Sequence, residues 1–274
     1  MNSNTIITPT PILTLDQLTY SYHTLSGETK ALENISFQIF PGEFVAVVGP
    51  SGCGKSTLLN IIAGQITDYT GVLNFHNTPM HTLQSRSADL HIGYMLQHDH
   101  LFDWRTIYKN VCLGLEIKNM MTDKNTDYVL SLLKKYGLYD FKDKKPSQLS
   151  GGMRQRAALI RTLALNPELL LLDEPFSALD YQTRLQVSGD IGNIIRENRK
   201  TAILVTHNLS EAISLADKII VLTKRPGRIK TEIKIELTMP EDGRKPSKPS
   251  EARSAKEFAR YYQEIWKELM QYDD

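Results

Sequence analysis

Short apolar blocks rich in β-branched residues and leucine recur along the chain and predict a set of strands. These blocks lie at residues 12–22, 31–39, 44–48, 72–75, 169–172, 202–206 and 218–222. A helix-like apolar pattern follows the block at 44–48, and helical stretches separate the last three blocks. Strands that alternate with helices form a largely parallel sheet covered by helices. The pattern therefore predicts an α/β fold.

The middle of the chain, residues 98–161, has a different pattern. It is helix-like throughout, with polar breaks at 121–125 and 142–147. Because strand blocks lie on both sides of it, we expect this stretch to be a helical subdomain inserted into the sheet domain.

The last part of the chain predicts a strand, a linker and a helix. A possible strand lies at 232–237, and residues 240–254 hold the Pro, Gly, Lys and Ser of a loop. Residues 255–270 have the periodicity of an amphipathic helix. The apolar positions of this helix are Phe258, Tyr262, Ile265 and Leu269. We therefore expect one domain over residues 1–238 and a linker with a C-terminal helix over 239–274.

Composition narrows the class of protein. The 274 residues are 41% hydrophobic and 23% charged, which is ordinary for a folded globular chain. Lys and Arg total 32 and Asp and Glu total 31, so the net charge of +1 gives no reason to expect a nucleic-acid partner. No apolar run approaches the roughly 20 residues that cross a bilayer. The 2 cysteines are too few for a disulfide framework, so a cytoplasmic setting is expected.

A glycine-rich segment directly after the block at 44–48 matches the phosphate-binding pattern G-x-x-x-x-G-K-[ST]. It consists of Gly49, Pro50, Ser51, Gly52, Cys53, Gly54, Lys55 and Ser56, and Thr57 follows it. The backbone N–H groups of such a loop, at the start of a helix, attract phosphate oxygens. We expect Lys55 to reach the β- and γ-phosphates and Ser56 to bind Mg²⁺. Cys53 is interpreted as a small loop residue rather than a redox group.

Two carboxylates follow the leucines at 169–172, namely Asp173 and Glu174. A buried strand that delivers acids at its carboxyl end suits a site beside a phosphate loop. We expect Asp173 to hold Mg²⁺, directly or through water, and Glu174 to orient or deprotonate the attacking water. The acid pair alone is weak evidence, and the phosphate loop strengthens it.

A third motif, LSGGMRQR at residues 149–156, lies between these two sites. Together the three segments resemble the ATP-binding cassette (ABC) ATPases, over residues 12–229. The resemblance implies the P-loop NTPase cassette fold, with a RecA-like sheet core and an inserted helical subdomain. It also implies ATP as ligand, Mg²⁺ as cofactor and ATP hydrolysis as the reaction.

The resemblance assigns roles to further residues. Gln97 is similar to the Q-loop glutamine, which contacts Mg²⁺ and the attacking water. Residues 177–180 resemble the D-loop, and His207 resembles the switch histidine that contacts the γ-phosphate. Tyr22 is the first candidate for the aromatic residue that stacks on adenine. Tyr20 is the alternative, because the loop at residues 24–29 leaves the alignment with the family open by a few positions.

The resemblance also implies a head-to-tail pair of cassettes. In the family each ATP lies between the phosphate loop of one chain and the LSGG segment of the other. Ser150, Gly151 and Gly152 are therefore expected to bind the γ-phosphate of the partner's nucleotide. A second ABC subunit is implied as partner, most simply an identical one.

Within the family, the chain more closely resembles one subgroup, the importer cassettes for nitrate, sulfonates and taurine. The segment 97–115 resembles that subgroup through Trp104 and the Asn110-Val111 pair, as do Met153 and residues 224–229. The resemblance implies transmembrane permease partners, an extracytoplasmic solute-binding protein acting indirectly, and a peripheral location at the cytoplasmic face of the membrane. The subunit would use ATP to energise import of a small anion or related polar compound.

The region 98–120 is expected to grip the permease, with Phe102 and Trp104 in a groove that holds one of its helices. Internal packing is the alternative for both aromatic residues. The chain departs from the subgroup at positions 98–99, 102–103 and 208, which leaves the cargo open among nitrate, sulfonates, taurine, bicarbonate and pyrimidine-type vitamin precursors. A soluble ABC ATPase not coupled to transport and a non-hydrolysing ATP sensor are the competing interpretations.

Overall fold

The computed structural model describes residues 10–25, 27–84, 91–244, 246 and 249–271. A six-stranded sheet forms its centre, in the order β10-β9-β3-β8-β7-β6. The strands are β3 (Phe44–Val48), β6 (Ile92–Met95), β7 (Leu169–Asp173), β8 (Thr201–Val205), β9 (Lys218–Leu222) and β10 (Ile229–Lys234). All neighbouring strands are parallel except β10, which pairs with β9 in the antiparallel sense.

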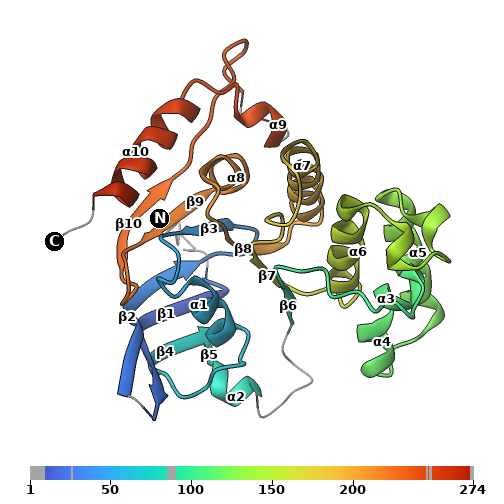
Figure 1. The fold of residues 1–274 in the computed structure, drawn as a ribbon, viewed down its shortest axis with the longest axis horizontal. Helices are drawn as coiled ribbons and strands as arrows, with labels where there is room; N and C mark the ends of the chain where they lie inside the picture. Colours follow the sequence, from blue (N-terminus) through green and yellow to red (C-terminus); the bar gives the residue numbers. More distant parts are fainter. Residues whose placement is uncertain (1–9, 26, 85–90, 245, 247–248, 272–274) are drawn as a thin grey trace, which may run out of the picture.

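The central strands are apolar on both faces because both faces are covered. Along β3, Phe44, Ala46 and Val48 belong to one hydrophobic core, while Val45 and Val47 belong to a second. The first core packs under α7 (Tyr181–Glu197) and α8 (Leu209–Leu215). The second core lies on the opposite face, where α1 (Lys55–Ile62) separates the central sheet from a smaller one (Figure 1).

The smaller sheet is antiparallel, in the order β2-β1-β4-β5. Its strands are β1 (Leu13–Thr24), β2 (Gly27–Ile39), β4 (Thr70–Phe75) and β5 (Thr78–Pro79), and the helix α2 (Met80–Gln84) follows β5. The strands expected at 12–22, 31–39 and 72–75 are therefore present, and each is longer than its apolar block. The sequence also predicts a turn at Ser26-Gly27 between the first two blocks; Ser26 lies outside the described residues, and Gly27 begins β2.

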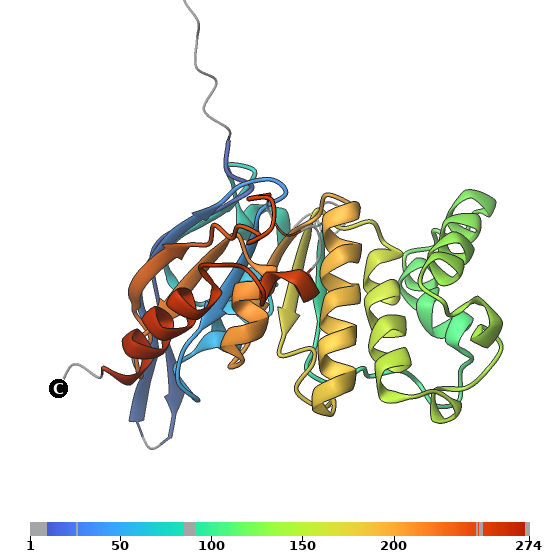
Figure 2. The ribbon, with the colours of Figure 1, turned by 90° about the horizontal axis from the view of Figure 1, so that it is seen from above.

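Helices fill the stretch between β6 and β7 and project from one side of the sheet domain (Figure 2). They are α3 (Ile107–Val111), α4 (Leu113–Ile117), α5 (Asp123–Lys135) and α6 (Gly151–Leu163), with short 3₁₀ turns at Tyr139–Phe141 and Pro146–Gln148. Helix α6 packs beside α7 and joins this helical group to the sheet domain. Among the described residues, no helix has the length and apolarity needed to cross a membrane.

The prediction for the C-terminal part is wrong in three details. The last strand is β10, Ile229–Lys234, and not 232–237. Ile235 and Leu237 are buried against the helical side of the core, so their apolar character reflects burial rather than pairing. The expected loop at 240–254 contains the helix α9 (Pro249–Ala252), whose Ala252 is 1% exposed.

The third detail is the buried face of the last helix, α10 (Phe258–Met270). Tyr261 and Ile265 are its buried residues, whereas Tyr262, expected on the inner face, is 38% exposed. The hydroxyl of Tyr261 accepts a hydrogen bond from the backbone N–H of Glu236 at 3.2 Å. This contact beneath the helix holds Tyr261 inward, a preference that apolar spacing alone does not express.

Candidate functional site

Parallel strands bring their carboxyl ends to one edge of the sheet, and the candidate residues lie at this edge. The phosphate loop follows β3, Gln97 follows β6, and Glu174 follows β7. His207 follows β8 by two residues. Segments up to 158 residues apart (49 to 207) are thus neighbours because their strands are parallel.

The phosphate loop needs glycine where it passes the second strand. Gly54 has φ +105°, and a Cβ there would lie 2.7 Å from the Leu32 side chain and 2.9 Å from the Ala31 carbonyl oxygen. Gly52 also has a positive φ, +75°. A side chain at Gly54 would push the loop off β2, so the motif's glycine is explained by close packing as well as by its backbone conformation.

Lys55 lies inside the curve of the loop. Its side chain is 8% exposed, and its Nζ donates to the carbonyl oxygens of Gly49 at 2.8 Å and Pro50 at 2.9 Å. Cys53 is 1% exposed beside it, and burial raises the pKa of the Cys53 thiol. The thiol is thus a packed, protonated group, while the ammonium of Lys55 provides a positive charge for an anion in the loop.

Asp173 is held between two hydroxyl groups. The Ser56 hydroxyl donates to Asp173 Oδ1 at 3.1 Å, and the Tyr94 hydroxyl donates to Oδ2 at 3.4 Å. Burial raises the pKa of the Asp173 carboxyl, and the hydrogen bond from Ser56 opposes this effect. One serine hydroxyl and one carboxylate are the hard oxygen donors that suit Mg²⁺ with phosphate, so the pair fits that ion.

Glu174 and His207 form a pair at the same edge. Glu174 Oε2 lies 3.1 Å from His207 Nδ1, and the backbone N–H of Glu174 donates to the Val205 carbonyl at 2.9 Å. Glu174 has φ +43°, an uncommon value for a residue with a side chain. The strained backbone turns the carboxylate out of β7 toward His207, two residues beyond the end of β8.

A cavity of about 290 Å³, here called the phosphate-loop cavity, lies between the phosphate loop and Glu174, and neither Asp173 nor His207 is among its described lining residues. Its lining residues are Tyr22, Ala31, Ser51, Gly52, Gly54, Lys55, Ser56, Thr57, Glu174 and Arg225. The Tyr22 hydroxyl lies 3.0 Å from Thr57 Oγ1, and its ring is 42% exposed. Tyr20 is 8% exposed and packs edge-on against Tyr22, outside the lining. Of the two tyrosines, the structure thus places Tyr22 at the cavity.

Gln97 approaches the acid pair through an intermediate residue. Its Nε2 donates to Ser177 Oγ at 3.2 Å, and Ser177 Oγ donates to the Glu174 carbonyl oxygen at 3.0 Å. The structure therefore connects the expected Q-loop residue to the expected D-loop and the expected base.

The LSGG segment, residues 149–152, lies apart from the phosphate-loop cavity. Within the described part of the chain, none of Ser150, Gly151 and Gly152 lines that cavity. Ser150 caps α6 by accepting from the Met153 backbone N–H at 3.3 Å. A Cβ on Gly152 would lie 2.8 Å from the Val187 side chain, so this glycine also permits α6 to pack on α7.

Sequence reasoning missed several groups in this region. Tyr94 contacts Asp173, Arg225 lines the cavity, and Glu211 is a buried carboxylate beside His207. Tyr94 is in the strand that the apolar pattern did not predict, and Arg225 comes from the turn after β9. The sequence marks the segment 224–229 only by its resemblance to the importer subgroup, and no local pattern predicts that Tyr94 or Arg225 lies at the phosphate loop, because only the folded sheet brings them there.

Glu211 allows a prediction about pH. Its carboxyl is 4% exposed, accepts from the Thr206 hydroxyl at 2.9 Å, and is also near Arg184, His207 and Arg253. Burial raises its pKa above the ordinary value of 4.5, although the hydrogen bond and these cations oppose the shift. The folded chain therefore keeps this proton at pH values where the unfolded chain has lost it. The free energy of unfolding should fall as the pH rises from about 4.5 through the raised pKa.

Glutamine at position 211 cannot titrate. The melting temperature of Glu211→Gln minus that of the wild type should therefore increase between about pH 4 and pH 8, by a few degrees for a shift worth about 1 kcal/mol. Glu197→Gln, an exposed glutamate on α7, is the control and should show no such trend. A difference for Glu211→Gln that stays constant with pH would contradict this explanation.

Comparisons with known proteins agree with the geometry. Residues 32–177 match the family model for ABC transporters. The uncharacterized ABC transporter ATP-binding protein YtlC of Bacillus subtilis is 44% identical over 257 residues, covering 94% of this chain and 95% of that protein. The aliphatic sulfonates import ATP-binding protein SsuB of Bacillus licheniformis is 39% identical over 215 residues, covering 78% and 81%.

The taurine import ATP-binding protein TauB of Jannaschia sp. is 40% identical over 209 residues, covering 76% of each chain. Among solved structures, the dimeric post-hydrolysis state of the ATP-binding cassette MJ0796, bound to ADP and Pi, is similar with a TM-score of 0.69 and 33% identity. It covers 82% of this chain and 99% of that one. These likenesses confirm the expected cassette fold and the expected family. The chain belongs to the ABC transporter family and is one of its ATP-binding, ATP-hydrolysing members.

Proposed function

We propose that this chain is the nucleotide-binding subunit of an ABC importer and hydrolyses ATP to drive uptake of a small anion or related polar solute. The observation that carries the enzymatic part is the contact between Glu174 and His207 at 3.1 Å, beside the phosphate-loop cavity. A carboxylate that can act as a base, in contact with an imidazole that can donate to phosphate, supports hydrolysis of a nucleotide bound in the loop. The same pair favours hydrolysis over a non-hydrolysing ATP sensor.

Each residue of the site has a role in the binding or hydrolysis of ATP. Tyr22 stacks on the adenine, and the loop N–H groups with Lys55 hold the β- and γ-phosphates. Ser56 and Asp173 would hold Mg²⁺, which would supply positive charge to neutralise the phosphates. Glu174 takes a proton from the attacking water as the water oxygen bonds to the γ-phosphorus and the bond to the β,γ-bridging oxygen breaks, so that ADP and phosphate are released.

His207 and Gln97 complete the reaction site. His207 contacts the γ-phosphate while Glu174 Oε2 holds its ring at Nδ1. Gln97, whose Nε2 donates to Ser177 Oγ, orients the water and would be a further ligand for Mg²⁺ if its side chain left Ser177. Hydrolysis then depends on a change in position of the segment that begins at Gln97, which also leads into the helical group.

The site is completed by a second cassette. Ser150, Gly151 and Gly152 lie on α6 and its cap, outside the cavity of their own chain. Donors at a helix N-terminus bind phosphate well, so this segment serves the nucleotide of the partner subunit, most simply an identical chain. The dimeric MJ0796 structure supports this arrangement.

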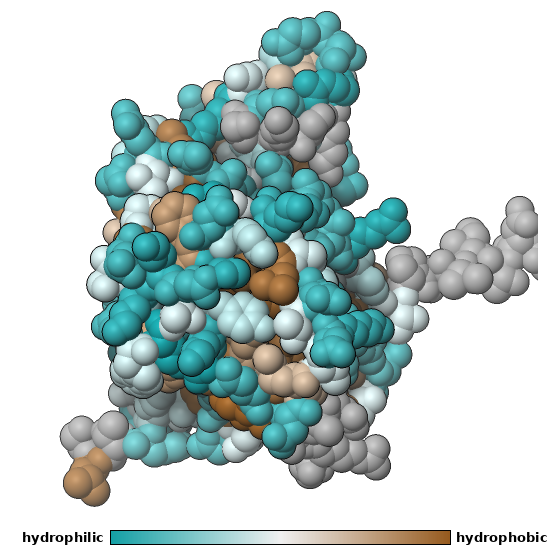
Figure 3. Space-filling model, turned by 90° about the vertical axis from the view of Figure 1, so that its right-hand side faces the viewer, coloured by the Kyte–Doolittle hydropathy of each residue, from teal (hydrophilic) through white to brown (hydrophobic). Residues whose placement is uncertain are grey.

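We divide the chain into an ATP-binding domain, residues 1–238, and a C-terminal part, residues 239–274. The helical subdomain at about 98–161 carries the exposed pair Phe102 and Trp104, whose rings stack with centroids 4.7 Å apart. Other large apolar side chains exposed in the same helical group are Ile117, Met120, Met121, Tyr139 and Phe141. Figure 3 shows apolar areas among polar ones on this side of the molecule.

An apolar surface of this kind suits a protein partner, and the permease is the partner we propose. The subunit would then lie at the cytoplasmic face of the membrane, held there by the permease. The names of the relatives TauB and SsuB support a sulfonate-like cargo, delivered to the permease by an extracytoplasmic solute-binding protein. A soluble ABC ATPase that is not coupled to transport is the second candidate, and the next experiment separates the two.

Trp104→Ala should weaken binding of the permease without destabilising the fold of the chain. Trp104 is 73% exposed, so its loss leaves no internal cavity and the melting temperature should stay unchanged. Because Trp104 would be a central aromatic of the contact, its replacement should reduce the amount of permease recovered by a mild-detergent pull-down about tenfold.

The matched control is Trp266→Ala, which removes the other of the 2 tryptophans, 48% exposed on α10. It should recover as much permease as the wild type. Recovery of soluble partners alone by the wild type, without any multi-span protein, would instead favour the soluble ATPase.

A further inference from the structure

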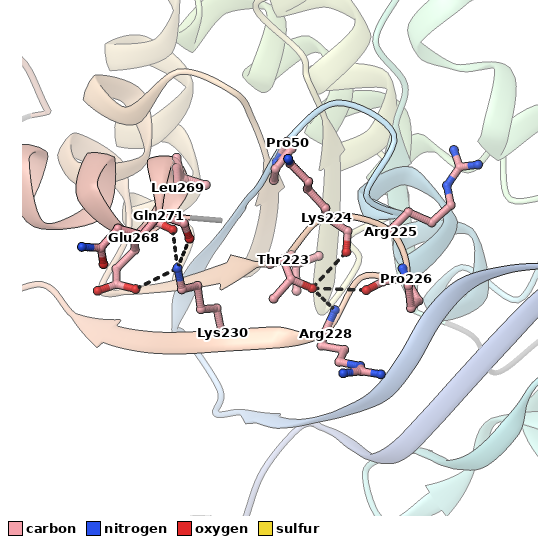
Figure 4. Close-up of a pocket in the computed structure, with 11 residues that line it drawn as sticks. Pro50, Thr223, Lys224, Arg225, Pro226, Arg228, Lys230, Glu268, Leu269 and Gln271 are labelled. Atoms are coloured by element: carbon pink, nitrogen blue, oxygen red, sulfur yellow. Dashed lines mark hydrogen bonds and ion pairs between the residues drawn. The ribbon is translucent and has the colours of Figure 1, made fainter. Parts of the chain in front are cut away.

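The turn at residues 223–228, between β9 and β10, packs directly on the phosphate loop (Figure 4). Gly227 donates its N–H to the Ala31 carbonyl at 2.9 Å and accepts from the Glu33 N–H at 2.9 Å. A Cβ on Gly227 would lie 2.2 Å from the Cys53 carbonyl oxygen, so only glycine permits this approach. The turn is thus fixed against both β2 and the loop.

This packing places Arg225 over the loop. Its Nε donates to the Gly52 carbonyl oxygen at 3.1 Å, and a Cβ on Gly52 would lie 3.3 Å from its Nη2. Figure 4 shows the side chain directed away from Lys230 and Glu268, which contact each other on the other side of the turn. Arg225 also lines the phosphate-loop cavity, together with Lys55.

The other arginine of the turn has a different environment. Arg228 forms hydrogen bonds with the Glu33 carboxylate through Nε at 2.8 Å and through Nη2. Arg225 bonds to a neutral carbonyl through Nε, and the described ion pairs of the chain include none for it. Since a guanidinium has further N–H donors on its Nη atoms, Arg225 keeps both charge and donors for an anion.

We propose that Arg225 is a nucleotide-binding residue whose guanidinium contacts the phosphate chain, as a second cation beside Lys55. The inference rests on the proposed nucleotide site in the phosphate loop. Among the described lining residues of that cavity, Lys55 and Arg225 are the cations and Glu174 is the acid. A polyphosphate carries more negative charge than one lysine balances, and arginine suits phosphate through paired hydrogen bonds. The 223–228 turn therefore supplies part of the nucleotide site.

The test compares nucleotides with different phosphate numbers. Binding of ATP, ADP and AMP to the full chain is measured by calorimetry for the wild type, Arg225→Gln and Arg225→Lys. Arg225→Gln should weaken the binding of ATP about tenfold, the binding of ADP less and that of AMP least, because the lost interaction is with the outer phosphates. Arg225→Lys should restore most of the ATP affinity, since it keeps the charge.

Lys224→Gln is the matched control, because Lys224 belongs to the same turn but does not line the phosphate-loop cavity. It should bind ATP as the wild type does. Unchanged ATP binding by Arg225→Gln would overturn the inference, and so would equal weakening of ATP, ADP and AMP, which would mean that Arg225 only braces the loop. Failure of the wild type to bind any of the three would refute the proposed nucleotide site itself.

Discussion

Replacing Glu174 by glutamine is expected to lower phosphate release by roughly a hundredfold or more while leaving ATP binding intact. The carboxylate directly follows β7, lies 3.1 Å from His207 Nδ1 and lines the phosphate-loop cavity. Glutamine keeps the shape and can still contact the imidazole, but its amide cannot take a proton from water. Single-turnover phosphate release and nucleotide binding measure the two effects separately.

The same variant should accumulate a nucleotide-bound dimer. If the LSGG segment of one chain completes the site of the other, blocked hydrolysis leaves ATP between the two chains. Light scattering at saturating ATP should then show twice the monomer mass, with 31.1 kDa as the reference. A monomer under these conditions would contradict the head-to-tail arrangement.

The matched control lies next to the other end of the same strand. Glu168 directly precedes β7 at its other end, is exposed, and pairs with His76 at 2.7 Å. Glu168→Gln should release phosphate as the wild type does. If Glu174→Gln also stayed within a few-fold of the wild type, Glu174 would not be the general base.

Lys55→Met is expected to weaken ATP binding by about a hundredfold, because it removes charge-assisted hydrogen bonds to phosphate. Lys55 is 8% exposed, and methionine can fill much of the space of its carbon chain. The carbonyl oxygens of Gly49 and Pro50 would lose their donor, so the loop would also be less well ordered. Equilibrium binding of a fluorescent ATP analogue measures the change.

Lys200→Met is the control for a lost lysine charge. Lys200 directly precedes β8, at the edge of the sheet away from the phosphate loop, and its Nζ donates to Asn166 Oδ1. It should bind ATP normally. Near-normal ATP binding by Lys55→Met would show that the loop does not hold the phosphates as proposed.

An element was predictable from the sequence where a single local pattern specifies it. The phosphate loop between a strand and a helix was predictable because its glycines and lysine are local requirements of phosphate binding. The buried strand before Asp173 was predictable because four successive leucines suit a strand covered on both faces. The strand β6 was not, because its four residues include Gly93 and Tyr94 and lack a distinctive period.

The C-terminal errors have a similar cause. The apolar residues at 235 and 237 indicated burial, and burial does not require strand pairing. Tyr261 and Tyr262 are the same residue type, so the sequence does not show which of them faces inward on α10. The hydrogen bond from the backbone N–H of Glu236 to the Tyr261 hydroxyl favours Tyr261. Periodicity describes one helix, whereas the partner of each face depends on another segment.

The sequence by itself determined the family, the cassette fold and the identity of the phosphate loop, because these depend on short motifs with strict local geometry. Only the tertiary structure placed Tyr22 rather than Tyr20 at the cavity and joined Gln97 to Ser177. It alone also brought Arg225 over Gly52, a contact between residues 173 positions apart. The physical reason is that a parallel sheet gathers the ends of distant strands at one edge, and the packing of those ends is decided by segments that no local pattern connects.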